Sequence, residues 1–128
     1  SYAGRDKMKQ LVIEKECLGY PICARIDIPA EGLAVLLTGG CKPHIGAVSS
    51  IEPGQEVLTS QFTGHREGVI SQQWAQALCS RYNTPTVVSC GIHYDGLSRE
   101  GINKVLDCSF SLLQEVFTSI DRISRGNR

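Results

Sequence analysis

The spacing of the apolar residues changes about halfway along the chain, and this change limits the folds that the chain can adopt. Up to about residue 63, short runs rich in β-branched residues alternate with turn residues, as β-strands and their connections do. After residue 66, two stretches with helical spacing enclose one short β-branched run. The predicted strands are Leu11–Cys17, Pro21–Ile28, Gly32–Thr38, Ile45–Ile51, Glu56–Thr63 and Thr86–Ile92. The predicted helices are Arg66–Tyr82 and Ser98 to about Ile123.

This order, βββββ-α-β-α, predicts an α+β fold: a mainly antiparallel sheet of about five to six strands with two helices packed on it. Within residues 21–28 apolar and polar residues alternate, as in a strand with one buried face. Residues 86–92 are nearly all apolar, which predicts a central strand that is buried on both faces. The 128 residues show no linker or repeat, so we expect one domain at residues 11–123, between a flexible N-terminus (1–10) and a polar tail (124–128).

The balanced charge of the chain argues against two classes of function. Lys and Arg total 13, as do Asp and Glu, so the chain lacks the basic excess of proteins that bind nucleic acids or membrane surfaces. The longest apolar run, Leu33–Leu37, is far shorter than the roughly 20 residues that span a bilayer. Residues 1–10 are too polar for a signal peptide. We therefore expect a soluble, cytoplasmic protein without a nucleic-acid or membrane partner.

The six cysteines are compatible with two redox states. An even number of cysteines is typical of disulfide-bonded secreted chains. Here a secretion signal is missing, and several cysteines, such as Cys79 and Cys108, lie in apolar helical patterns. Free cysteine behaves as a small buried apolar residue, so the pattern favours reduced thiols.

The three histidines lie at strand ends or turns, each beside glycine and further polar residues. If these junctions meet at one sheet edge, they form a candidate binding site. The three segments are Gly-Gly-Cys-Lys-Pro-His-Ile-Gly at 39–46, Thr-Gly-His-Arg-Glu-Gly at 63–68 and Cys-Gly-Ile-His-Tyr-Asp-Gly at 90–96.

The first segment has the residues of an anion-binding turn. Gly39 and Gly40 allow close approach by a ligand, and their N–H groups are able to point together toward an anion. Lys42 adds a positive charge, and Pro43 stiffens the turn that aims His44. The simpler alternative is a glycine-rich hairpin with a lysine in solvent.

The second segment is predicted to open a helix at Thr63 or Gly64, which places His65 and Arg66 in its first turn. Positive residues are unfavourable there unless an anion binds, because the helix N-terminus already carries partial positive charge. In the alternative interpretation, Arg66 pairs with Glu67 or another neighbour in solvent.

The third segment follows the C-terminal end of the predicted buried strand, where open α/β sheets place ligands. After Gly91, the side chains of His93 and Asp95 share one side of an extended chain, so Asp95 is positioned to orient His93 or to accept a ligand hydroxyl. The alternative is a surface histidine next to an aspartate that turns the chain.

Two catalytic interpretations compete with ligand binding. Cys41, His44, Cys90 and His93 would give a Cys₂His₂ zinc set, but the short Cys-x₂₋₄-Cys spacing of structural zinc sites is missing. Cys41 or Cys90 would also serve as the thiol of a Cys–His nucleophilic pair, although nothing in the sequence marks either as activated. We therefore expect no metal and assign no catalytic residue.

Together, the three segments resemble the LpdD-like family of prenylated flavin chaperones, the small D-type subunit of gallate and hydroxyarylic acid decarboxylases. The resemblance rests on Gly-Gly-x-Lys-Pro-His-Ile-Gly-Ala-Val, Gly-His-Arg-Glu and Gly-Ile-His-Tyr-Asp in this order, and it covers about residues 11–120.

The resemblance implies a non-catalytic protein that binds prenylated FMN, or FMN, as cargo and delivers it to a UbiD-type decarboxylase. A separate flavin prenyltransferase, a second expected partner, makes the cofactor. Trp74 and Tyr94 are candidates for a wall against the flavin ring, with the helix core as the stronger expectation for Trp74. The binding site would consist of Gly39, Gly40, Lys42, Pro43, His44, Gly64, His65, Arg66, Gly91, His93 and Asp95.

Two other functions remain open at this point: a small His-based or metal-assisted enzyme that uses His44, His65 and His93, and an assembly subunit of the decarboxylase without a ligand. The long C-terminal helix has more apolar positions than one buried stripe needs, which also predicts a homodimer.

Overall fold

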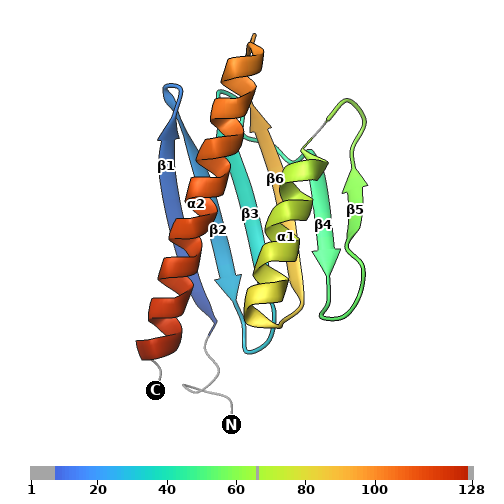
Figure 1. Cartoon of the computed structure of the whole chain (residues 1–128), viewed down its shortest axis with the longest axis vertical. Helices are drawn as coiled ribbons and strands as arrows, with labels where there is room; N and C mark the ends of the chain where they lie inside the picture. The colour runs from blue at the N-terminus through green and yellow to red at the C-terminus, as the bar shows by residue number, and fades with distance from the viewer. Residues whose placement is uncertain (1–7, 66, 127–128) are drawn as a thin grey trace.

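The computed structural model describes residues 8–65 and 67–126, the last two by their backbone alone, and they form one six-stranded sheet and two helices (Figure 1). The predicted α+β class and element order are confirmed. The strands are β1 (Lys9–Cys17), β2 (Tyr20–Ile28), β3 (Leu33–Gly40), β4 (Ala47–Ile51), β5 (Leu58–Gln61) and β6 (Thr86–His93). The helices are α1 (Gly68–Tyr82) and α2 (Arg99–Gly126).

The sheet is antiparallel except for one central pair of strands. The spatial order is β1-β2-β3-β6-β4-β5, so the last strand is inserted between the third and the fourth. β6 runs parallel to β3 and antiparallel to β4. The parallel pairing sets Gly40 opposite His93, so the C-terminal ends of β3 and β6 lie side by side at one edge. This pairing brings two of the three predicted segments together.

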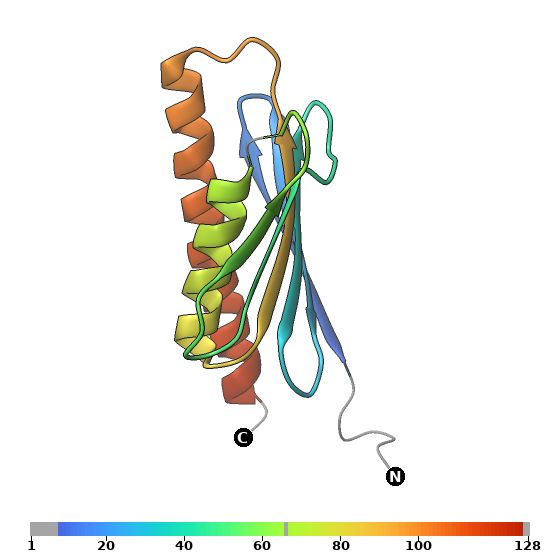
Figure 2. The ribbon, with the colours of Figure 1, turned by 90° about the vertical axis from the view of Figure 1, so that its right-hand side faces the viewer.

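Both helices pack on the same face of the sheet (Figure 2). α2 crosses β1 and β2, and α1 covers β4, β5 and β6. Alternate residues of the central strands form the core beneath the helices, as the period of two predicted for β2 requires: Ile22, Ala24 and Ile26 are at most 1% exposed. Trp74 of α1 is 1% exposed in the same core, where its indole N–H donates to Ser109 Oγ at 2.9 Å.

The opposite face of the sheet is not covered by a helix of the described chain (Figure 2). The side chain of Val87 in β6 is 42% exposed there and that of Val12 in β1 is 55% exposed. The prediction that residues 86–92 are buried on both faces is therefore wrong. A short apolar run cannot distinguish a strand with two covered faces from one with a single covered face.

The start of α1 differs from the prediction. The chain turns at residues 62–65, where the His65 N–H donates to the Phe62 carbonyl at 3.0 Å and Gly64 has a φ of +80°. This left-handed conformation cannot be part of a helix. The helix begins at Gly68 instead, so His65 lies before it, and the predicted position of His65 in the first turn is wrong. Arg66 lies outside the described residues.

The other boundaries move by a few residues. β1 starts at Lys9, within the predicted N-terminal segment, whereas residues 1–7 lie outside the described residues. β4 and β5 are shorter than predicted. Ser98 caps α2 as predicted, because its Oγ accepts the N–H of Gly101 at 3.1 Å, and this helix continues beyond Ile123 to Gly126.

Three further properties of the described residues bear on the remaining predictions. All six cysteines are free thiols, as predicted. Within the described residues, neither helix has the length and apolarity that crossing a bilayer requires. The extra apolar positions of α2 form an exposed stripe, in which the exposed fractions are 49% for Ile102, 40% for Leu106 and 63% for Phe110. The homodimer stays a prediction.

Candidate functional site

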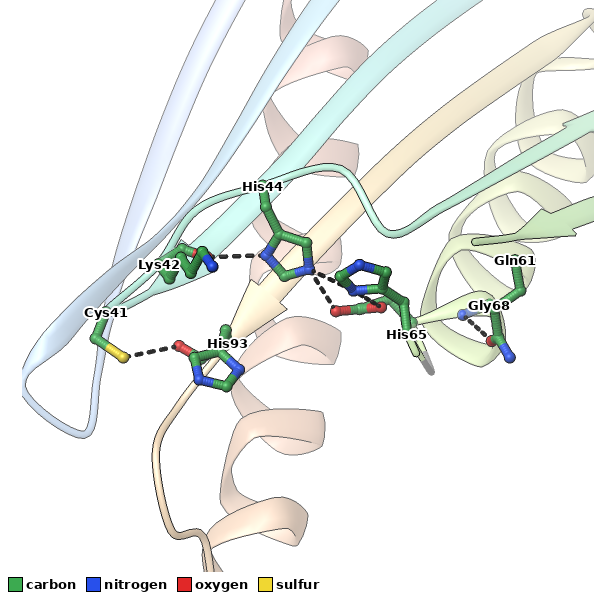
Figure 3. A network of polar contacts seen from close by, with 8 residues as sticks. Cys41, Lys42, His44, Gln61, His65, Gly68 and His93 are labelled. Carbon is green, nitrogen blue, oxygen red and sulfur yellow. Dashed lines mark hydrogen bonds and ion pairs between the residues drawn. The ribbon is translucent and has the colours of Figure 1, made fainter. Parts of the chain in front are cut away.

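The three Gly/His segments converge on one open pocket at the edge where β3 and β6 end. The pocket has a volume of about 550 Å³. All three histidines contribute to its wall, which confirms that the segments meet. Figure 3 shows the ring of His44 between Lys42 and His65, with His93 below them. The lining residues are Lys42, His44, Ile45, Gly64, His65, Glu67 and His93.

Backbone hydrogen bonds to β6 hold the segment that carries Lys42 and His44. The Cys41 N–H donates to the His93 carbonyl at 2.8 Å, and the Gly46 N–H donates to the Cys90 carbonyl at 2.8 Å. Between these two bonds the segment passes over Gly91, where an added Cβ would lie 1.8 Å from the His44 carbonyl oxygen. Gly91 is therefore required because another backbone lies against it.

The turn at residues 62–65 and the start of α1 form the second wall. Gln61 at the end of β5 caps the helix, since its Oε1 accepts the N–H of Gly68 at 3.0 Å. Glu67, the residue before the helix, turns its carboxylate toward the histidines rather than toward the N–H groups of the helix. The position before Gly68 thus places a negative group in the pocket.

His44 links the two walls. Its Nδ1 is 2.9 Å from the Lys42 carbonyl oxygen, and its Nε2 is 2.8 Å from Glu67 Oε1 and 3.1 Å from His65 Nδ1 (Figure 3). The rings of His44 and His65 lie 4.7 Å apart between centroids and are tilted by 32°. The side chains of His44 and Glu67 are 16% and 12% exposed and that of His65 is 36% exposed, so the contact between His44 and Glu67 is the most shielded part of the cluster.

His93 and Asp95 form a separate, more exposed pair, as predicted for Asp95. His93 Nε2 lies 2.8 Å from Asp95 Oδ1, and the Cys41 thiol lies 3.6 Å from Asp95 Oδ2. These two hydrogen bonds, that of His93 first, lower the pKa of the Asp95 carboxyl below its usual range. Asp95 itself does not line the pocket.

Several predicted site residues support the pocket rather than line it. An added Cβ on Gly39 would lie 2.9 Å from the side chain of Ile22, and one on Gly40 would lie 1.8 Å from the His93 carbonyl oxygen. The absence of side chains at these glycines makes room for protein atoms. Pro43 and Gly91 also lie outside the lining, whereas Lys42, His44, Gly64, His65 and His93 belong to it. The predicted role of Arg66 falls outside the described residues.

The Cys₂His₂ combination considered from the sequence is not formed. Cys90 is 0% exposed and faces the core beneath the helices, and this burial raises the pKa of its thiol to about 12. A buried thiol with a raised pKa also argues against Cys90 as a nucleophile. The donors that do come together are His44, His65 and Glu67 in one group and Cys41, His93 and Asp95 in another.

Neither aromatic candidate for the flavin wall lines the pocket. Trp74 is enclosed in the core, as expected. The Tyr94 hydroxyl donates to the Cys17 carbonyl at 2.7 Å, and the Tyr94 ring packs edge-on to Tyr20. His44, His65 and Ile45 line the pocket in their place, with the two imidazole rings lying against each other.

Sequence reasoning missed Glu67 and Ile45 as pocket residues. Glu67 had been considered only as a partner for Arg66. Its position gave a signal, because carboxylates are favoured beside a helix N-terminus, but the predicted helix start was too early to reveal it. Ile45 was assigned to a strand, whereas β4 begins two residues later, at Ala47.

Comparisons with known proteins agree on a family and a fold. The model of the prenylated flavin chaperone LpdD-like domain matches residues 16–121. Protein LpdD of Lactiplantibacillus plantarum is 22% identical over 108 residues, in an alignment that covers 80% of this chain and 79% of that protein. A chain in the crystal structure of a chaperone complex for yeast 20S proteasome assembly superposes with a TM-score of 0.60 at 11% identity, over 90% of this chain and 96% of that one. This last likeness shows the fold alone.

Proposed function

Because this chain belongs to the prenylated flavin chaperone LpdD-like family, we propose that it is a non-catalytic carrier that binds prenylated FMN, or FMN, as cargo. Family membership supports a chaperone-type role. The resemblance described above extends this proposal to the partners: the recipient would be a UbiD-type decarboxylase, and a flavin prenyltransferase would be the source of the cargo.

The observation that carries the proposal is the open pocket at the ends of β3 and β6. Its volume of about 550 Å³ lies within the roughly 300–1,000 Å³ of small-molecule sites. Lys42 supplies a cation for the phosphate at its rim, and the imidazole rings with Ile45 supply a surface for the isoalloxazine. An open site suits a carrier, because cargo that is to be released must not be fully enclosed.

Glu67 adds a condition to this proposal. A carboxylate in the pocket repels a phosphate unless a positive group lies beside it. Among the described residues, His44 and His65 lie next to Glu67 and can carry this charge. The charge of this cluster therefore decides how well the pocket accepts an anion.

The direct experiment is to purify the chain after co-expression with a flavin prenyltransferase and to identify bound chromophore by absorbance and mass spectrometry. We expect stoichiometric flavin and faster activation of an apo-decarboxylase of UbiD type. Absence of flavin together with no effect on activation would refute the carrier role. Activation without bound flavin would favour the assembly subunit instead.

A charge-matched pair of variants tests the site. Lys42→Ala should weaken flavin binding roughly ten- to a hundredfold, because a hydrogen bond to a charged group contributes about 1.5–3 kcal/mol. Lys104→Ala removes the same charge from the exposed surface of α2, away from the pocket, and should bind flavin as the unmodified chain does. Equal affinities of the two variants would contradict the assignment of Lys42.

A further inference from the structure

Two imidazole nitrogens and a carboxylate in the wall of the pocket approach one another as the ligands of a single ion do. His44 Nε2 lies 2.8 Å from Glu67 Oε1 and 3.1 Å from His65 Nδ1, and His65 Nδ1 lies 3.8 Å from Glu67 Oε2. Around a tetrahedral zinc ion with bonds of about 2.0–2.1 Å, neighbouring ligand atoms are roughly 3.3 Å apart. The two distances from His44 Nε2 lie below this value, and the distance from His65 Nδ1 to the second carboxylate oxygen lies above it. A rotation of the carboxylate toward His65 is therefore needed for one Glu67 oxygen to complete the set.

The contacts of His44 require a hydrogen or a metal ion between its Nε2 and the Glu67 carboxylate. A carbonyl oxygen only accepts, so His44 Nδ1 carries a hydrogen, which it donates to Lys42. In the neutral imidazole, Nε2 then presents a lone pair, and at 2.8 Å it faces an oxygen of the Glu67 carboxylate, which is also an acceptor. Two lone pairs at this distance repel unless a proton or a metal ion lies between them.

We propose that His44 Nε2, His65 Nδ1 and one oxygen of Glu67 bind a divalent transition-metal ion of the Zn²⁺ type. Two imidazoles and one carboxylate are a donor set that suits this class of ion. The bond from His44 Nδ1 to the Lys42 carbonyl is the outer contact that metal-bound histidines usually make, and it aims the other ring nitrogen at the ion. The proposal does not depend on flavin binding.

The backbone around the cluster is shaped for these side chains. An added Cβ on Gly46 would lie 2.4 Å from Glu67 Oε2 and 3.0 Å from the Cβ of His65. Only glycine at this position allows the carboxylate and the imidazole to come in against the chain. A fourth coordination position would face the pocket, because all three donor residues line it. An open position is typical of zinc sites that accept an external ligand.

In the second group of donors, neutral side chains already carry the hydrogens that its contacts need. In the Cys41, His93 and Asp95 group, a hydrogen on His93 Nε2 satisfies the 2.8 Å contact with Asp95, and the Cys41 thiol donates to the other carboxylate oxygen. The side chain of Asp95 is also 86% exposed, in contrast to 12% for Glu67. Cys41 nevertheless provides a control, because it is the thiol donor of the competing group.

The test is titration of the purified, metal-free full chain with Zn²⁺ by calorimetry, followed by dialysis and elemental analysis. We expect one zinc ion per chain, binding at least about a hundredfold weaker in His44→Ala and Glu67→Gln, and unchanged binding in Cys41→Ser. If the unmodified chain binds no stoichiometric zinc, the proposal is overturned, and a proton rather than a metal ion lies between His44 and Glu67. If the Cys41→Ser variant loses zinc and the Glu67→Gln variant retains it, the ion is bound by Cys41, His93 and Asp95 instead.

Cobalt substitution gives a readout that needs no variant. Co²⁺ bound by two imidazoles and a carboxylate should show visible d–d bands without the near-ultraviolet charge-transfer band of a cobalt–thiolate bond. A strong thiolate band in the unmodified chain would contradict the assignment. Because these measurements use the metal alone, failure of flavin binding leaves their outcome untouched.

Discussion

Gly91→Ala is expected to displace His44 without touching any side chain of the pocket. The added Cβ would lie 1.8 Å from the His44 carbonyl oxygen and 2.9 Å from the Ile45 nitrogen, whereas real Cβ contacts stay beyond 3.0 Å. The segment above β6 must therefore move by about 1.2 Å or more, since close-packed atoms cannot overlap. A shift of this size breaks the 2.8 Å contact between His44 and Glu67.

Overpacking of this kind should lower the free energy of unfolding by about 1–3 kcal/mol. Affinity for Zn²⁺, and for flavin if the carrier proposal holds, should fall at least about tenfold, since a displacement near 1 Å spoils a site that depends on its geometry. Calorimetric titrations measure the affinities, and urea unfolding measures the stability of the same preparations.

Gly54→Ala is the matched control. Gly54 has a φ of +81° in the connection between β4 and β5, and nothing lies within 4 Å of an added Cβ. The left-handed backbone should cost about 1–2 kcal/mol of stability, similar to the cost at Gly91, while the pocket stays intact. If folded Gly91→Ala binds both ligands as well as Gly54→Ala does, the close approach at Gly91 does not position His44, and the reasoning is refuted.

Three further predictions concern the core and its titrating groups. Ser109→Ala should destabilise the chain by about 1–3 kcal/mol in urea unfolding, because the buried Trp74 N–H loses its acceptor; a loss below about 0.5 kcal/mol would contradict this. Burial, followed by the hydrogen bond to Asp121, raises the pKa of Tyr82 to about 12, whereas an unfolded tyrosine ionises near pH 10. Stability should therefore fall between pH 10 and 12, and less steeply in Tyr82→Phe. Iodoacetamide at pH 8 should leave Cys90 unlabelled in the folded chain while the half-exposed Cys41 reacts, as peptide mass spectrometry would show.

The sequence predicted the elements better than their arrangement. Alternation of apolar residues identified the strand at Ile22–Ile28, and helical spacing identified α1 and α2, because both patterns are local. The insertion of β6 between β3 and β4 depends on pairings between distant residues, which no local pattern encodes. The exposure of Val87 follows from the same cause, since the number of covered faces is a property of the whole sheet.

The sequence predicted where the site lies but not the contacts between its residues. Glycine beside histidine at three strand ends pointed to Lys42, His44, His65 and His93, which do line one pocket. The partner of His44 was missed, because the turn at Gly64 delays the helix and thereby brings Glu67 to the edge of the pocket. The zinc combination failed for a geometric reason: Cys90 points to the covered face of β6, whereas Gly91 next to it faces the pocket segment.

The parallel pairing of β3 with β6 also makes the pocket depend on contacts between distant parts of the chain. Cys41 and His93 are 52 residues apart, with β4, β5 and α1 between them. Contacts between such distant residues form slowly, after the local hairpin of β1 and β2 has become possible. A ligand held there engages only the completed molecule, so its binding free energy adds to the stability of the whole sheet. The chain without ligand should thus unfold more readily than the chain with ligand bound, and proteolysis with and without ligand would measure the difference.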